Sequence, residues 1–188
     1  MSDENKIQEL ISIFYCEKDK DVENFLKDKS IIFEKLGKSR TYFIYDENAE
    51  EFNILAYFTL AMQVLKVPEE LLSGRKTKLL DGYGSKIKGE KITEFPTILI
   101  GQIGKNDLYK ELISGKEIME YCILLVLRGQ ATLGGRIIML ECKDIPYIIN
   151  LYEKFGFQKL ERNYEDDEFL QMIKILDADE IINPEEVG

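Results

Sequence analysis

The segment from Ile103 to Met119 has the composition of an anion-binding turn. A predicted strand ends at Ile103, a polar connection follows, and a predicted helix starts at Lys116. The first N–H groups of a helix lack partners inside it, and the helix dipole adds partial positive charge there. Gly115 has no Cβ to keep a phosphate away from the backbone, and Lys110 and Lys116 add charge. The pattern indicates a phosphate site, although glycine before a helix is also an ordinary turn residue.

A second segment, 144–157, carries a tyrosine close to a predicted helix end. The apolar spacing predicts a helix over 145–155 that is ended by Gly156, because glycine adopts the left-handed conformation of helix C-caps. Tyr152 lies about one turn before that end. By itself, a tyrosine at this position is most simply an aromatic residue at the edge of the core.

The sequence contains no histidine. Nucleophile systems of the Ser-His-Asp and Cys-His types are therefore excluded, as are zinc sites with histidine ligands. Acid–base chemistry near neutral pH must come from carboxylates with shifted pKa values, tyrosine, lysine or bound water.

The elements that would position these residues follow from the apolar periodicity. Hairpins and strand–helix–strand crossovers alternate, which predicts an α/β (α+β) fold with a mixed sheet flanked by helices. Residues 68–73 are expected to open a short helix, and the basic stretch from there to Lys91 is expected to be a loop. Strands are predicted at 9–16, 41–45, 54–60, 97–103, 136–142, 157–160 and 169–176, and helices at 21–37, 116–128 and 145–155.

The net charge of −10 is unevenly distributed. Residues 161–188 hold ten acids and two bases, whereas residues 75–91 hold six bases and two acids. The overall charge argues against generic nucleic-acid binding, which needs clustered Lys and Arg. We expect a single domain over 1–176, followed by a solvated acidic tail over 177–188.

Cysteine usage and hydropathy indicate a cytoplasmic protein. Cys16, Cys122 and Cys142 are scattered and odd in number, which predicts reduced thiols and no disulfide framework. No run of about 18 apolar residues is present, and the acidic N-terminus lacks the pattern of a signal peptide.

The two chemical segments together resemble the GNAT family of acetyltransferases. In that family a central strand and the next loop carry Arg/Gln-x-x-Gly-x-Gly/Ala, and a later helix ends close to Leu-Tyr-Glu-Lys-x-Gly-Phe. The loop keeps only the final glycine of its pattern, in Lys110-Glu-Leu-Ile-Ser-Gly115, with Ile113 at the middle glycine position. The helix pattern is matched by Leu151, Tyr152, Glu153, Lys154, Gly156 and Phe157.

The resemblance is close over 95–160 and loose over the N-terminal half. There, residues 14–17, 24–26, 39–42 and 55–60 are similar to the GNAT subgroup that contains aminoacyl-tRNA-acetylating toxins, and to phage and stand-alone relatives. The resemblance implies a GNAT-like, mostly antiparallel sheet, acetyl-CoA as co-substrate and no metal.

The resemblance also implies roles for individual residues. The Ile103 N–H would polarise the acetyl carbonyl, and the Tyr152 hydroxyl would act as catalytic acid on the departing thiolate. The base is not assigned: Glu94, Glu141 and Asp144 are candidates that would act through water, and water alone is the alternative. The implied acetyl-CoA contacts are Ile103, Lys105, Lys110, Glu111, Leu112, Ile113, Ser114, Gly115 and Lys116.

The implied function is acetyl transfer to a primary amine, and the acceptor stays open. A small-molecule or peptidic amine is favoured if the basic segment 75–91 is neutralised by the acidic tail. Toxin-like acetylation of charged tRNA is the alternative if that segment is free to hold phosphates, although the net charge weighs against it. A degenerate CoA-binding module without catalysis is a further alternative. Exposed sheet edges allow a homodimer, and no membrane partner is expected.

Overall fold

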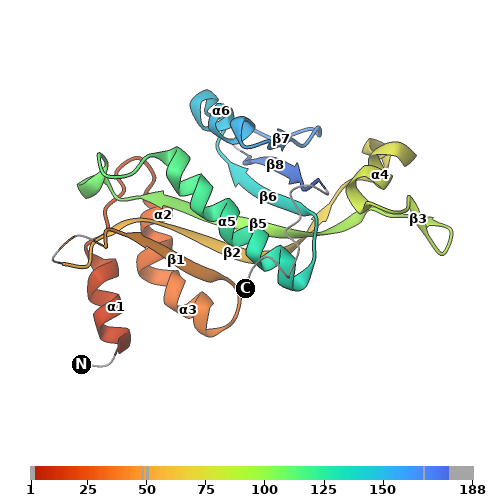
Figure 1. The fold of residues 1–188 in the computed structure, drawn as a ribbon. Helices are drawn as coiled ribbons and strands as arrows, with labels where there is room; N and C mark the ends of the chain where they lie inside the picture. The colour runs from red at the N-terminus through yellow and green to blue at the C-terminus, as the bar shows by residue number, and fades with distance from the viewer. Residues whose placement is uncertain (1–2, 48, 50, 167, 178–188) are drawn as a thin grey trace. The chain divides into compact units, whose positions relative to one another are not determined.

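Six strands of the chain form one sheet, and two short strands form a separate hairpin (Figure 1). The structure is a computed structural model and describes residues 3–47, 49, 51–166 and 168–177. The strand order in the sheet is β1-β2-β5-β6-β8-β7, and β3 pairs with β4. The predicted α/β class, with a mostly antiparallel sheet and helices, is confirmed.

Contacts divide the chain into two compact units. The first unit is Met1–Ala61 with Ile100–Cys122, and the second is Met62–Leu99 with Ile123–Gly188. The division of the chain into a domain over 1–176 and a tail stays a prediction, and most of that tail, 178–188, lies outside the described residues. In order, the elements are α1 (Asp3–Ser12), α2 (Lys20–Asn24), the π-helical η1 (Phe25–Lys29), α3 (Ser30–Lys35), β1 (Arg40–Tyr45), β2 (Ile54–Lys66), the 3-10 helix η2 (Glu69–Leu71), α4 (Gly74–Asp81), β3 (Lys86–Ile87), β4 (Glu90–Lys91), β5 (Glu94–Lys105), the 3-10 helix η3 (Asp107–Tyr109), α5 (Gly115–Leu133), β6 (Ile137–Cys142), α6 (Pro146–Lys154), β7 (Gln158–Lys159) and β8 (Leu170–Ile175).

Most of the predicted elements are present, with shifted ends. The predicted strands at 41–45 and 54–60 pair antiparallel as β1 and β2. The closing strands β7 and β8 also pair antiparallel, as expected. Gly156 has φ +84° just after α6, which confirms its predicted role in ending that helix.

The strand predicted at 9–16 is wrong. Residues up to Ser12 form α1, and the following residues run to α2 without regular structure. Ile11 and Phe14 are buried three residues apart, which is a helical spacing, and they pack against Ile54 and Tyr57 of β2. A short apolar run fits a strand and a helix equally well, and here tertiary packing selects the helix.

The loop predicted up to Lys91 is also wrong, because this stretch contains α4 and the β3–β4 hairpin. Ser73 caps α4: its Oγ accepts from the Lys76 N–H at 3.1 Å, and its carbonyl accepts from the Thr77 N–H. Thr77 and Leu80 are buried on the inner side of the helix. The basic side chains on the other positions conceal this amphipathic pattern in the sequence.

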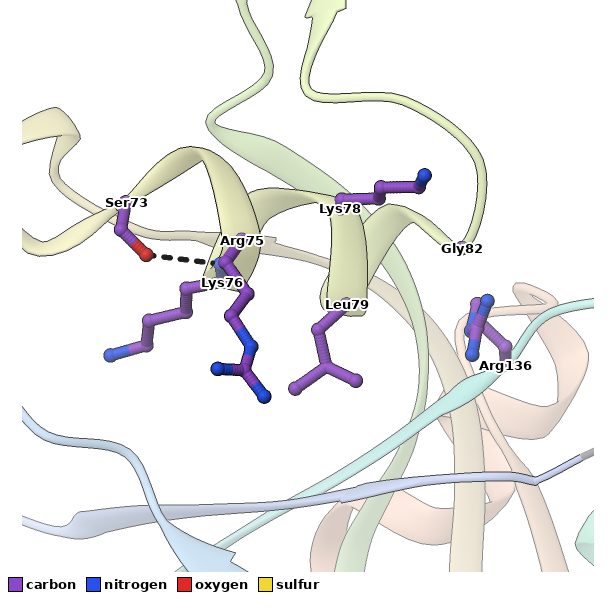
Figure 2. Close-up of a pocket in the computed structure, with 7 residues that line it drawn as sticks. All are labelled: Ser73, Arg75, Lys76, Lys78, Leu79, Gly82 and Arg136. Carbon is purple, nitrogen blue, oxygen red and sulfur yellow. Dashed lines mark hydrogen bonds between the residues drawn. The ribbon is translucent and has the colours of Figure 1, made fainter.

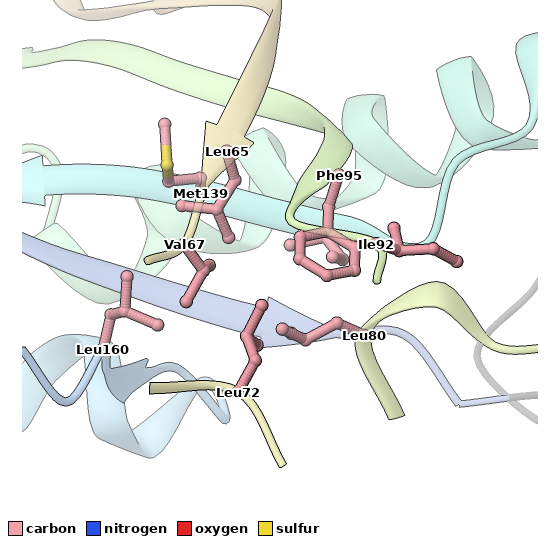
Figure 3. Packing of buried hydrophobic residues seen from close by; sticks show 9 residues of the cluster. Leu65, Val67, Leu72, Leu80, Ile92, Phe95, Met139 and Leu160 are labelled. Atoms are coloured by element: carbon pink, nitrogen blue, oxygen red, sulfur yellow. The ribbon is translucent and has the colours of Figure 1, made fainter. Parts of the chain in front are cut away.

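The second unit has its own apolar core, to which α4 contributes (Figure 3). β6 and β8 pair antiparallel from Ile137 opposite Ile175 to Cys142 opposite Leu170. The core thus joins the C-terminal end of β2, α4, the start of β5, β6 and the residue after β7. Its buried members are Leu65, Val67, Leu72, Leu80, Ile92, Phe95, Ile137, Met139 and Leu160.

The three cysteines are buried and form no disulfide, as predicted. Burial raises the pKa of Cys122 to about 12 and that of Cys142 to about 11, which keeps both thiols protonated and unreactive. None of the described helices is long and apolar enough to cross a membrane.

A buried carboxylate organises the N-terminal part of the first unit. Glu23 on α2 accepts hydrogen bonds from Lys20 Nζ at 2.8 Å and Lys27 Nζ at 2.7 Å, and from the Cys16 N–H at 3.0 Å. These donors, with the two lysines first, lower the pKa of Glu23 from 4.5 to about 2. The carboxylate therefore ties the segment before α2 to the helix.

Replacing Glu23 by Gln removes a charge that is stabilising only while it is ionised. Because its folded pKa lies below its ordinary value, the stabilisation is fully present above pH ~4.5 and is lost as the pH falls from there towards 2. We expect Glu23→Gln to lower the free energy of unfolding by about 1–3 kcal/mol at pH 7, and the difference from wild type to shrink below pH ~4.5. Urea unfolding at several pH values measures this, with the exposed Glu17→Gln as control. A difference that does not change with pH would contradict the assignment.

Candidate functional site

The site predicted around Ile103–Met119 lies in the first unit, where β5 leads through η3 into α5. β5 ends at Lys105, two residues beyond the predicted strand end, and α5 begins at Gly115, one residue before the predicted start. The strand–loop–helix arrangement predicted from the sequence is therefore present, and the loop between the two elements is 106–114.

Asn106 holds the start of this loop. It is 1% exposed, and its side chain makes three hydrogen bonds. Its Nδ2 donates to the Ile54 carbonyl at 2.8 Å, and its Oδ1 accepts from the N–H groups of Tyr15 at 3.3 Å and Leu108 at 3.1 Å. Its backbone N–H donates to the Leu55 carbonyl at 2.9 Å. A buried amide satisfied on both ends fixes its surroundings, because each lost bond would leave a desolvated polar group.

The two carbonyls that Asn106 binds belong to an irregularity in β2. Ile44 pairs with Ala56, whereas Tyr45 pairs with Ile54, so Leu55 is an extra residue in the strand. Consecutive carbonyls of a regular strand point to opposite edges, and this β-bulge allows Ile54 and Leu55 to bind the same residue. The start of the loop is thus anchored to β2 at this bulge.

Asp107 attaches the loop to the segment between α1 and α2. The Asp107 N–H donates to the Tyr15 carbonyl at 2.8 Å, and Asp107 Oδ2 accepts from the Glu17 N–H at 2.7 Å. Further on, the Tyr109 hydroxyl donates to Asn53 Oδ1 at 2.7 Å. The loop is therefore anchored to both the β1–β2 region and the segment after α1.

Gly104 is required for the close approach of β5 to these elements. A Cβ there would lie 2.4 Å from Tyr57 Cε1 and 2.7 Å from Val22 Cγ1. Tyr57 cannot easily move away, because it is fully buried and its hydroxyl donates to the Val22 carbonyl at 2.6 Å. Burial also raises the pKa of Tyr57, which keeps this hydroxyl a donor.

Backbone N–H groups remain available at the far end of the loop. Those of Glu111, Gly115 and Lys116 donate to no described residue. Glu111 and Lys116 are exposed, and Gly115 is half-buried. Unpartnered N–H groups at the start of a long helix form a site for an anion.

The bulky residue at the middle glycine position does not block this end of the loop. Ile113 is buried, and it packs with Leu55, Ala56 and Ile118. Leu112, by contrast, is 59% exposed. The Ile113 side chain therefore serves the core, so that an apolar residue here is compatible with a functional loop.

Ser114 and Glu117 form a capping box at the start of α5. The Glu117 N–H donates to Ser114 Oγ at 3.2 Å, and the Ser114 N–H donates to Glu117 Oε2 at 2.8 Å. The hydrogen bonds from Ser114, with Lys105 and Lys116 nearby, lower the pKa of Glu117. The Ser114 N–H, a predicted acetyl-CoA contact, is therefore already occupied by a carboxylate.

The other predicted contacts differ in their surroundings. Lys110 is exposed, and Lys105 is half-buried. Lys116 forms an ion pair with Glu120 at 3.2 Å, one turn further along α5. The Ile103 side chain packs against the cluster of buried residues formed by Leu55, Ala56, Ile113 and Ile118. The structure thus brings the predicted contacts 103–116 together on one strand, its loop and the next helix.

Tyr152, the predicted catalytic acid, lies in the second unit, on the last turn of α6. Its ring is half-buried, and the centroid is 6.1 Å from that of the buried Phe157. The Tyr152 carbonyl accepts from the N–H groups of Phe155 and Phe157, which closes the helix before Gly156. The Leu-Tyr-Glu-Lys-x-Gly-Phe motif therefore forms a helix end that fixes the tyrosine backbone.

The three candidate bases are surface carboxylates. Glu94 Oε1 forms an ion pair with Lys66 Nζ at 2.9 Å, and Glu141 accepts from Gln171 Nε2 at 3.0 Å. Asp144 is exposed. Nothing in their surroundings distinguishes one of them as a base.

Sequence reasoning missed Asn106, Gly104 and Glu117. The capping box was readable, because Ser114-x-x-Glu117 is its signature. Asn106 and Gly104 gave only the signal of a polar turn, since their partners are distant in sequence.

Comparison with solved structures identifies the fold. AtaT complexed with acetyl-methionyl-tRNAfMet matches with a TM-score of 0.62 and 16% identity, over 86% of this chain and 85% of AtaT. AtaTR bound with acetyl-CoA matches with a TM-score of 0.61 and 19% identity, over 84% of this chain and 83% of that chain. A tyrosine-to-phenylalanine mutant of KacT matches with a TM-score of 0.62 and 15% identity, over 86% of this chain and 85% of that chain. No family model and no curated protein sequence matches. The chain therefore has the fold of these toxin structures, which confirms the fold expected from the GNAT resemblance.

Removing the Asn106 side chain should loosen the whole loop. Asn106→Ala leaves the Ile54 carbonyl and the Tyr15 N–H without their partner, and we expect the free energy of unfolding to fall by about 2–4 kcal/mol. Chemical denaturation measures this loss. The matched control is Asn150→Ala on the exposed side of α6, which should change stability by less than about 0.5 kcal/mol. Equal effects of the two substitutions would show that Asn106 does not hold the loop.

Proposed function

We propose that this protein is an N-acetyltransferase that takes its acetyl group from acetyl-CoA. The observation that carries the proposal is the loop after β5 with the start of α5, where the N–H groups of Glu111, Gly115 and Lys116 have no partner among the described residues. Such a cradle suits the pyrophosphate of CoA, since backbone N–H groups bind phosphate oxygens and need no particular side chain. The acetyl-CoA bound to AtaTR, a structure of the same fold, supports the assignment.

The residues around the cradle fit an anionic ligand. Lys110 and Lys116 would add charge, and Ile113 leaves room because its side chain is in the core. Glu117 would compete, because its carboxylate occupies the Ser114 N–H. Glu117 would leave this position when the pyrophosphate binds, because two anions at one helix start repel each other. Binding of CoA would therefore replace the Glu117 carboxylate with the pyrophosphate at the start of α5.

The remaining roles follow the GNAT resemblance. Acetyl-CoA would supply a thioester, and the Ile103 N–H would stabilise negative charge on the acetyl oxygen. Tyr152 would donate its hydroxyl proton, or a hydrogen bond, to the thiolate that leaves. The amine that attacks must lose a proton, which passes to water or to a carboxylate that acts through water. We place this activity in the cytoplasm, in agreement with three buried, unpaired thiols.

An aminoacyl-tRNA is the more specific candidate acceptor, and a small or peptidic amine is the other. The AtaT structure contains acetyl-methionyl-tRNA, the product of acetylating such an acceptor. In this chain α4 supplies Arg75, Lys76 and Lys78 on an ordered helix, so these cations have fixed positions that suit a phosphate-bearing acceptor. The net charge of −10 favours small cationic amines.

Tyr152→Phe keeps the ring and removes only the hydroxyl. We expect turnover to fall by about 10²-fold, as is typical for loss of an acid–base group, while acetyl-CoA still raises Tm. Transfer of radiolabelled acetyl to charged tRNA, a polyamine and a peptide measures this and identifies the acceptor. Tyr147→Phe, at an exposed position on the same helix, should leave turnover unchanged.

Two results would contradict the proposal in different ways. Wild-type turnover in Tyr152→Phe would remove the tyrosine from the chemistry. Binding of acetyl-CoA with no labelling of any acceptor would instead identify a CoA-binding module without catalysis.

A further inference from the structure

A pocket of about 570 Å³ lies on the second unit, between α4 and the start of β6 (Figure 2). Arg75, Lys76 and Leu79 extend from one side of α4 into the same space, and Arg136 comes from just before β6. Lys78 leaves the helix on another side. Two segments some 60 residues apart in sequence thus place their cations around one space.

Three of the four cations of this pocket form no ion pair within the described part of the chain. Arg75, Lys78 and Arg136 form no ion pair with a described residue, and Lys76 is 3.9 Å from the exposed Glu161. Arg136 Nε is buried without a hydrogen-bond partner among the described residues. In a chain of net charge −10, where carboxylates outnumber bases, such a cluster requires an explanation.

The charges on α4 are arranged against its own stability. The helix reads Gly-Arg-Lys-Thr-Lys-Leu-Leu-Asp, so that Arg75 and Lys76 lie in its first turn and its only acid, Asp81, lies last, while Lys78 lies in the last turn. The helix dipole favours the opposite arrangement, with acids first and bases last. An anion bound at this end would reverse the penalty, since it would face both the cations and the positive end of the helix.

Arg136 packs against the C-terminal end of α4. Gly82 ends α4 with φ +89°, and a Cβ at Gly82 would lie 1.7 Å from Arg136 Nη1. The guanidinium therefore packs on the backbone of the α4 C-cap, where only glycine leaves room. A planar guanidinium held in this way can bind two oxygens of one phosphate.

We propose that this pocket binds the phosphate backbone of an RNA. Leu79 is 57% exposed beside the cations, and its apolar surface suits a ribose or a base, which free phosphate lacks. The inference rests on the proposed function, because it identifies the acceptor as an RNA-linked amine. It adds a binding site that is formed by α4 and Arg136 alone.

The test is fluorescence anisotropy of a labelled, non-aminoacylated RNA hairpin with the full chain. At 50 mM salt, Arg75→Ala with Lys76→Ala should weaken binding at least about 10-fold and reduce the slope of log affinity against log salt by about 1–2. Arg136→Lys keeps the charge and loses the fork, so a smaller loss of about 3-fold or more is expected. The matched control, Lys6→Ala with Lys18→Ala, removes two exposed lysines outside the pocket and should change affinity less than 2-fold.

Equal loss in the pocket and control variants would overturn the proposal, because binding would then follow net charge alone. Pocket-dependent binding of inorganic phosphate or of a polyglutamate peptide, without binding of the hairpin, would also overturn it. Acetyl-CoA should raise Tm equally in all variants. A normal acetyl-CoA shift without RNA binding sinks only the RNA site, whereas pocket-dependent RNA binding without any acetyl-CoA shift sinks only the acetyltransferase function.

Discussion

The candidate site depends on the hydrogen bonds between Asn106 and the bulge of β2. One amide side chain and one N–H hold the carbonyls of Ile54 and Leu55, and the same side chain holds the Tyr15 N–H. Three segments that are distant in sequence therefore meet at a single buried residue. Because every polar atom of this side chain is used, the loop that follows has one defined start. Its far end reaches α5 with N–H groups that have no partner in the described part of the chain. The bulge is what makes this possible, since a regular strand does not offer two neighbouring carbonyls to one partner.

The far end of the loop shows a balance between stability and binding. A capping box stabilises α5, and it does so by placing the Glu117 carboxylate where a bound anion would gain most from the helix dipole. The first turn of α4 shows the reverse, since Arg75 and Lys76 lie at the positive end of the helix dipole, where a bound anion would be favourable. The start of α5 thus already holds the Glu117 carboxylate, whereas the first turn of α4 contains no acidic residue.

Local patterns predicted the parts of the structure that local physics decides. The β1–β2 hairpin, the long α5 and the end of α6 follow from apolar spacing and from Gly156. The strand predicted at 9–16 failed because Ile11 and Phe14 are selected by packing against β2, and the loop predicted up to Lys91 failed because charges conceal the buried Thr77 and Leu80. Asn106 could not be identified, because its partners lie 91 and 52 residues away and exist only in the folded chain. The local pattern indicated an anion site near Gly115, whereas the role predicted for Tyr152 came from the resemblance to a family.

The central claim is that backbone N–H groups after β5 bind the pyrophosphate of acetyl-CoA. Two-dimensional ¹H–¹⁵N NMR during a titration with acetyl-CoA tests it directly, because an N–H that donates to a phosphate changes its proton shift. The account predicts that the amides of Glu111, Gly115 and Lys116 shift most, and that Ser114 shifts with them as Glu117 is displaced, while amides of β8 stay in place. Saturable binding that leaves these four amides unchanged would contradict the account.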